Sequence, residues 1–167
     1  MDSPFSRQVI PTRPMPKLTV AIAADHAGFP LKGLVCDEVA ALGFDVLDLG
    51  THGLESVDYP DFGRKCAEAV ASGRAARGIV ICGTGLGISM AANRNPGVRA
   101  APCHDTGSAR LTRQHNDANI LALGARLIGP EVARDCVRTF LTTEFEGGRH
   151  AARVKKLGET AGPEVKA

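Results

Sequence analysis

The sequence predicts one α/β domain, in which helices cover both faces of a parallel sheet. Five short segments are apolar almost throughout, and segments with helix signals alternate with them from end to end. Strands of continuous apolar character are typical of a parallel sheet that is buried on both faces. No internal repeat and no linker interrupts the alternation, so we expect a single domain with right-handed crossovers.

The expected elements follow one another in a regular order. Strands are predicted at 18–24, 44–49, 78–82, 98–103 and 120–123. Helices are predicted at 31–42, between Pro30 and Gly43, and at 61–72, 86–93, 108–114 and 130–142. Proline at the start and glycine just past the end are typical helix boundaries. Residues 147–157 indicate a basic C-terminal helix or arm.

Composition limits the classes of function. The 167 residues are 44% hydrophobic and 23% charged, with no tryptophan, which indicates a folded domain with an aliphatic core. The formal net charge of +2 is too small to predict a nucleic-acid or membrane partner. We find no stretch close to the ~20 apolar residues that a membrane helix needs.

The ends of the chain differ from its middle. Residues 1–16 contain four prolines and two arginines but no apolar segment, which argues against a secretory signal and predicts a disordered leader. The domain is expected to span 17–157, and 158–167 is expected to form a loose tail.

The cysteines do not indicate a disulfide framework. They are odd in number, scattered, and form no C-x-x-C pair: Cys36, Cys66, Cys82, Cys103 and Cys136. This usage favours a reduced, cytoplasmic protein whose cysteines are mostly small core residues.

A metal site has little support, because the histidines lack H-x-x-x-H spacing and the glycine-rich segment contains no acidic residue.

The most distinctive local feature is the segment Cys82-Gly83-Thr84-Gly85-Leu86-Gly87-Ile88-Ser89. Its three glycines lie between a predicted strand and a predicted helix, where backbone N–H groups can face an anion. Neither the dinucleotide fingerprint nor the P-loop pattern fits. A thiolate is stabilised beside a helix N-terminus, so Cys82 is a candidate base or nucleophile. A tight turn with a buried cysteine is the alternative.

Three further polar groups are candidates. His115-Asn116-Asp117 precedes the fifth strand, and a loop histidine can act as a general acid near neutral pH. Asp25-His26 follows the first strand and is either a helix cap or part of a site. Arg149 and Arg153 are four residues apart, so a helix would place both on one face, suited to a phosphate. A solvated basic end explains this spacing equally well.

Together these motifs resemble the type B ribose-5-phosphate isomerases, a family that includes allose- and galactose-6-phosphate isomerases. The resemblance runs from about Lys17 to Leu157 and rests on five segments in order: Ala24–Phe29, Asp58–Pro60, Ile81–Asn93, Arg113–Asn119 and Glu146–His150. It implies a three-layer α/β/α Rossmann-like fold with a five-stranded parallel sheet. It also implies a homodimer or homotetramer with shared active sites, and no metal or organic cofactor.

The resemblance also implies roles for individual residues. Cys82 is expected to move a proton between C1 and C2 of the sugar, and His115 to help open the furanose ring. Asp25 is expected to assist at the ring oxygen or hydroxyls, with Tyr59 nearby. The remaining residues are expected to hold the enediolate (Gly83, Thr84, Gly85, Gly87 and Asn116) or the phosphate (His26, Arg126, Arg149 and Arg153).

Two positions bear on the reaction and the sugar. One branch of the family places a glutamate where this chain has Ile88, so the cysteine branch fits. Gly107 stands where many relatives carry an aromatic residue, so the sequence does not decide which sugar phosphate is the substrate.

Interconversion of ribose 5-phosphate and ribulose 5-phosphate is the expected reaction. The alternatives are isomerisation of a hexose 6-phosphate or a tetrose phosphate, and a non-catalytic sugar-phosphate-binding domain.

Overall fold

A computed structural model describes residues 16–159. Five parallel strands form one sheet in the order β2-β1-β3-β5-β4. The strands are β1 (Thr19–Ala24), β2 (Asp45–Asp48), β3 (Arg77–Cys82), β4 (Ala100–Pro102) and β5 (Ile120–Gly124). The predicted α/β fold with a five-stranded parallel sheet is therefore confirmed. The predicted leader, except for Pro16, and the tail beyond residue 159 lie outside the described residues.

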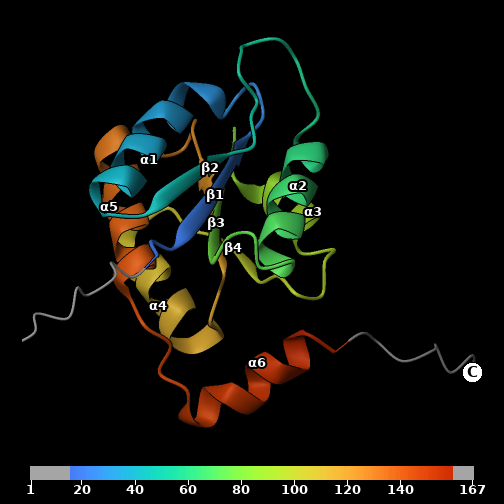
Figure 1. The fold of residues 1–167 in the computed structure, drawn as a ribbon, viewed down its shortest axis with the longest axis vertical. Coiled ribbons are helices and arrows are strands. Elements are labelled where there is room, and N and C mark those ends of the chain that lie inside the picture. The colour runs from blue at the N-terminus through green and yellow to red at the C-terminus, as the bar shows by residue number, and fades with distance from the viewer. Residues whose placement is uncertain (1–15, 160–167) are drawn as a thin grey trace, which may run out of the picture.

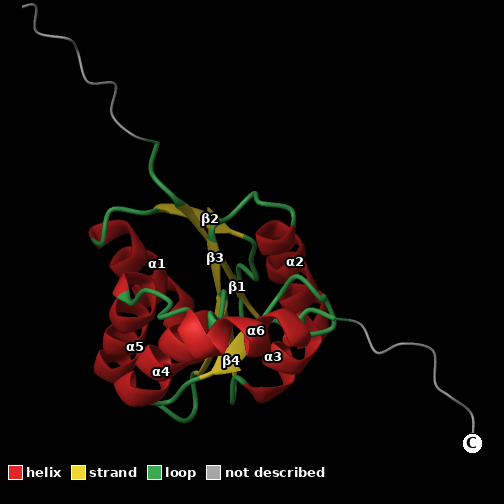
Figure 2. Cartoon of the chain, turned by 90° about the horizontal axis from the view of Figure 1, so that it is seen from below, coloured by secondary structure: helices red, strands yellow, loops and turns green. Residues whose placement is uncertain are grey.

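Helices cover both faces of this sheet (Figures 1 and 2). One apolar cluster joins α1 (Phe29–Ala41), α4 (Thr106–Asn116) and α5 (Pro130–Thr142) to side chains such as Val20 and Ile22. The other joins α2 (Tyr59–Ala71) and α3 (Leu86–Ala92) to the alternate residues Ala21 and Ala23. The side chains of a strand alternate between faces, so each apolar strand contributes to both clusters.

The C-terminal segment stands apart from these layers. A short 3₁₀ helix, η1 (Gly148–His150), leads into α6 (Ala151–Leu157), which lies beyond the end of the sheet at the bottom of Figure 1. Seen from below, α6 runs across the amino ends of the strands (Figure 2). No residue of α6 itself is buried, whereas the preceding His150 is.

Some predicted boundaries were wrong by a few residues, and local hydrogen bonds explain the differences. β4 begins at Ala100 rather than at Val98, because the Val98 and Arg99 amides donate to Asn95 O and Asn119 Oδ1 instead of to a neighbouring strand. α4 begins at Thr106 because the Asp105 carboxylate accepts the Ser108 amide and caps the helix. The predicted helix 130–142 matches α5.

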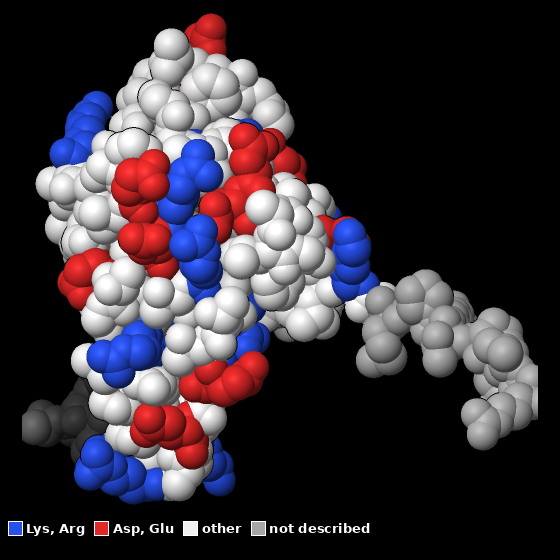
Figure 3. Space-filling model, turned by 90° about the vertical axis from the view of Figure 1, so that its left-hand side faces the viewer, with Lys and Arg blue, Asp and Glu red and all other residues white. Residues whose placement is uncertain are grey.

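Charged side chains on the outer face of α1 and α5 are mixed in sign (Figure 3). Glu38 of α1 is nearly buried and accepts hydrogen bonds from Arg134 at 3.5 Å and Arg138 at 2.8 Å on α5.

Among residues 16–159, no helix combines the length and apolar character that would be needed to cross a membrane.

Candidate active site

Cys82 ends β3 and opens the glycine-rich loop that leads into α3. The Gly85 amide donates a hydrogen bond to Cys82 Sγ at 3.1 Å, so the thiol lies against the loop backbone. Cys82 is only 5% exposed and also contacts the apolar cluster beneath α2 and α3. Thr84 Oγ1 accepts the Leu86 amide at 3.3 Å. The loop therefore brings a thiol, a hydroxyl and backbone amides close together, a combination of groups that suits stabilisation of an oxyanion.

The shape of this loop depends on two glycines. Gly85 adopts φ +77°, a conformation that L side chains rarely adopt. Gly124, at the end of β5, lies so close to the loop that a Cβ there would be 2.6 Å from the Thr84 carbonyl oxygen. The neighbouring strand therefore supports the loop backbone directly.

Several predicted site residues lie around the loop. A Cβ on Gly87 would lie 2.7 Å from the Tyr59 ring, and one on Gly83 would lie 3.3 Å from Arg126 Nη1. The Arg126 amide also donates to Gly83 O at 2.9 Å. Tyr59 from the start of α2 and Arg126 from the end of β5 thus approach the loop from two directions.

Asp25 and His26 follow β1 at the same edge of the sheet. The Asp25 carboxylate is nearly buried and accepts the Gly28 amide at 2.9 Å, so it stabilises the turn into α1. His26 Nδ1 lies 3.2 Å from both the backbone amide and the carbonyl oxygen of Val57. An open hollow of about 570 Å³ is lined by His26, Arg126 and apolar side chains.

A second group of predicted residues lies elsewhere, at the end of α4. His115 and Asn116 line a hollow of about 330 Å³ together with His150 and Arg153, and Arg149 immediately precedes His150 in η1. The turn after Asn116 is held firmly: Asp117 has φ +45° and accepts hydrogen bonds from Arg99 and from the buried Arg113.

The two groups are at opposite ends of the sheet. Cys82 pairs with Gly124 at the carboxyl ends of β3 and β5, whereas Gly78 pairs with Ile120 at their amino ends. Four residue steps along a strand separate these pairs by about 13 Å. Because α4 runs back before β5 begins, His115 and Asn116 lie at the amino end with α6 (Figure 1). A single chain therefore does not bring Cys82 and His115 together.

The other four cysteines are poor candidates for the base. Burial raises the pKa of the Cys66 thiol to about 12 and that of Cys103 to about 11. Burial also raises the pKa of Cys136 to about 11, and that of the half-exposed Cys36 is raised by burial and then by Asp48. These thiols stay protonated at neutral pH and are poor bases.

Comparison with known proteins decides the family. The sequence model of the ribose/galactose isomerase family matches residues 20–157. The chain belongs to the ribose/galactose isomerase family. The chain is 46% identical over 138 residues to ribose-5-phosphate isomerase B of Escherichia coli (strain K12), covering 83% of this chain and 93% of that protein.

Two further members of the ribose/galactose isomerase family are informative. D-erythrulose-4-phosphate isomerase of Pectobacterium atrosepticum is 44% identical over 142 residues, which cover 84% of this chain and 93% of that protein. The solved structure of Clostridium thermocellum ribose-5-phosphate isomerase B is 59% identical, with a TM-score of 0.83, and the match covers 84% of this chain and 95% of that one. The chain is thus an isomerase with the fold of type B ribose-5-phosphate isomerases.

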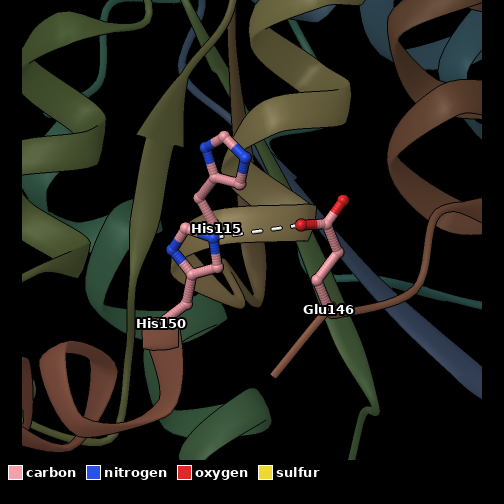
Figure 4. A group of neighbouring side chains, drawn as sticks. All are labelled: His115, Glu146 and His150. Atoms are coloured by element: carbon pink, nitrogen blue, oxygen red, sulfur yellow. Dashed lines mark ion pairs between the residues drawn. The ribbon is translucent and has the colours of Figure 1, made fainter. Parts of the chain in front are cut away.

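Sequence reasoning assigned no role to three residues that contact the predicted groups. His104 Nε2 lies 3.2 Å from Thr84 O, and its only sequence signal was its place at the end of a strand. Glu146 and His150 lie beside His115, although they are more than thirty residues away in the sequence (Figure 4).

These three side chains, His115, Glu146 and His150, offer potential metal ligand atoms within 4.8 Å of one another, which histidine spacing alone did not reveal. The two imidazole rings are stacked, with only 13° between their planes. Imidazole lone pairs lie in the ring plane. In this arrangement they run side by side rather than converging on one ion, so the geometry does not favour a metal.

Proposed function

We propose that this chain interconverts ribose 5-phosphate and ribulose 5-phosphate, with Cys82 as the base. The observation that carries the proposal is the hydrogen bond from the Gly85 amide to Cys82 Sγ, at the mouth of a loop whose amides can face an oxyanion. The name of the Escherichia coli relative supports the substrate pair. The five free cysteines suit a reducing compartment such as the cytoplasm.

In the proposed reaction, the Cys82 thiolate removes the proton from C2 of the open-chain aldose. The electrons move to the carbonyl oxygen at C1 and form an enediolate, which the loop around Thr84 stabilises. The hydroxyl proton on O2 passes to O1, the thiol returns a proton to C1, and the ketose forms. His115 acts earlier, as the acid that opens the furanose ring, and Asp25 assists at the sugar hydroxyls. A phosphate held by His26, Arg126, Arg149 and Arg153 would position the reacting carbons.

This reaction requires a second copy of the chain. His115, Asn116 and the arginines of η1 and α6 lie at the end of the sheet opposite Cys82, so one chain supplies only half of the required groups. The exposed helix α6 carries Arg153 and extends beyond the sheet, where a partner can meet it (Figure 2). We therefore propose a dimer with two shared sites, each combining the Cys82 group of one chain with the His115 group of the other.

A tetrose phosphate is the second candidate substrate, because the Pectobacterium atrosepticum relative is a D-erythrulose-4-phosphate isomerase. Gly107, in the first turn of α4, has open space on most sides, since a Cβ there would contact only Asp105 within 4 Å. A side chain at this position would therefore meet little of the chain's own structure.

A panel of substrates tests the proposal. Purified protein is given ribose 5-phosphate, allose 6-phosphate, galactose 6-phosphate and erythrulose 4-phosphate, and kcat/KM is measured for each. We expect the highest kcat/KM with ribose 5-phosphate. A higher kcat/KM with erythrulose 4-phosphate would indicate that the substrate is the tetrose phosphate and not the pentose phosphate. Binding of these sugars without turnover of any of them would indicate a non-catalytic domain.

A further inference from the structure

The ring of His115 lies face to face with the ring of His150. The two ring centroids are 4.4 Å apart (Figure 4). His150 is 8% exposed, and its Nε2 lies 3.9 Å from Glu146 Oε2. The His150 ring thus covers one face of the proposed ring-opening acid, and the Glu146 carboxylate lies beside it.

This contact is built within one chain. The Glu146 amide donates to Gln114 O at 3.1 Å, directly beside His115. The buried Arg113 donates through Nε to Thr143 O at 3.2 Å. Two hydrogen bonds therefore fasten the segment that carries Glu146 and His150 to the helix that carries His115.

The charges around His150 favour its neutral form. Its pKa is lowered by burial, then by the positive charge of His115 and by Arg149, with a smaller contribution from Arg153. Glu146 opposes these effects and raises the pKa. Two protonated rings stacked face to face would repel each other, so the neutral form of His150 stacks on His115 without this repulsion.

We propose that His150, which lies beside Glu146, is a positioning residue that fixes the His115 ring by stacking and so orients the acid that opens the sugar ring. The inference rests on the proposed isomerase function. It concerns ring opening alone, because proton transfer between C1 and C2 depends on Cys82.

The chemistry of the two sugars separates these steps. Ribose 5-phosphate is mostly a closed furanose and must be opened before C2 can be deprotonated. Ribulose 5-phosphate has its C5 oxygen phosphorylated and stays open. Exchange of the C1 hydrogen of ribulose 5-phosphate with heavy water therefore requires the base and the assembled site, but no ring opening.

The test compares His150→Ala, which removes the stacked ring, with His150→Phe, which keeps a ring that cannot titrate. We expect His150→Ala to lower kcat/KM for ribose 5-phosphate by about tenfold or more, which is part of the roughly 10²- to 10⁴-fold that a general acid contributes. We expect its C1 exchange with ribulose 5-phosphate to stay close to the wild-type rate, and His150→Phe to restore most of the ribose 5-phosphate activity. The exposed His52→Ala is the matched control.

Each other outcome has a distinct meaning. Equal losses of both activities in His150→Ala would overturn the positioning role, as would a His150→Phe protein that is as slow as His150→Ala. Unchanged activity of His150→Ala with ribose 5-phosphate would overturn it too. If the wild-type protein neither isomerises nor exchanges either sugar, the proposed function itself fails.

Discussion

Replacing Cys82 with serine should lower kcat for ribose 5-phosphate by about 10³-fold, within the range that a positioned general base contributes. A serine hydroxyl ionises far less readily than a thiol, so it cannot remove the C2 proton at neutral pH. Steady-state kinetics of Cys82→Ser measure this loss directly. Because serine is close in size to cysteine, the Gly85 amide retains an acceptor and the loop should keep its shape.

The half-exposed Cys36 provides a matched control for this substitution. It lies on α1, away from the glycine-rich loop. Cys36→Ser should retain wild-type kcat, and both variants should have thermal unfolding midpoints close to that of the wild-type protein. Near-normal turnover by Cys82→Ser would rule out Cys82 as the base.

The second large effect concerns the shared site. Cys82→Ser and His115→Ala homodimers should both be nearly inactive with ribose 5-phosphate. A heterodimer of the two chains contains one site with both substitutions and one site with neither. We expect such a heterodimer, co-expressed and purified through two different affinity tags, to regain about half of the wild-type activity, since one of two equivalent sites is intact.

If each site instead lies within a single chain, the heterodimer gives a different result. Each of its two sites would then carry one substitution, and the activity of the heterodimer would equal the average of the two inactive homodimers. A heterodimer built from Cys82→Ser and wild-type chains provides the reference for one working site in two. No gain above the homodimers would contradict the proposed sharing.

Sequence alone was sufficient to predict most of the fold. Buried apolar strands such as β3 and proline-led helices such as α5 have strong local signals, and their predicted bounds were close to those observed. The weaker predictions concern segments whose ends are set by side-chain hydrogen bonds. Asn119 holds Arg99 out of β4, and Asp105 extends α4 at its start. The first pairing joins residues far apart in the sequence, and the second is a local helix cap, so neither has a periodic signal.

The elements that carry the candidate residues were predictable from the sequence, but the arrangement of these residues in space was not. The glycines around Cys82 predict a loop at the end of β3, and the loop lies there. The motif order does not reveal that α4 carries His115 to the opposite end of the sheet. The stack of His115 on His150 was equally hidden, because it joins helices separated by β5 and α5.

The most direct test of the central role of Cys82 is hydrogen exchange in heavy water, followed by proton NMR. Wild-type protein given ribulose 5-phosphate should replace a C1 hydrogen with deuterium and form ribose 5-phosphate deuterated at C2, while Cys82→Ser should do neither. Rapid exchange or isomerisation catalysed by Cys82→Ser would contradict proton transfer through this thiol.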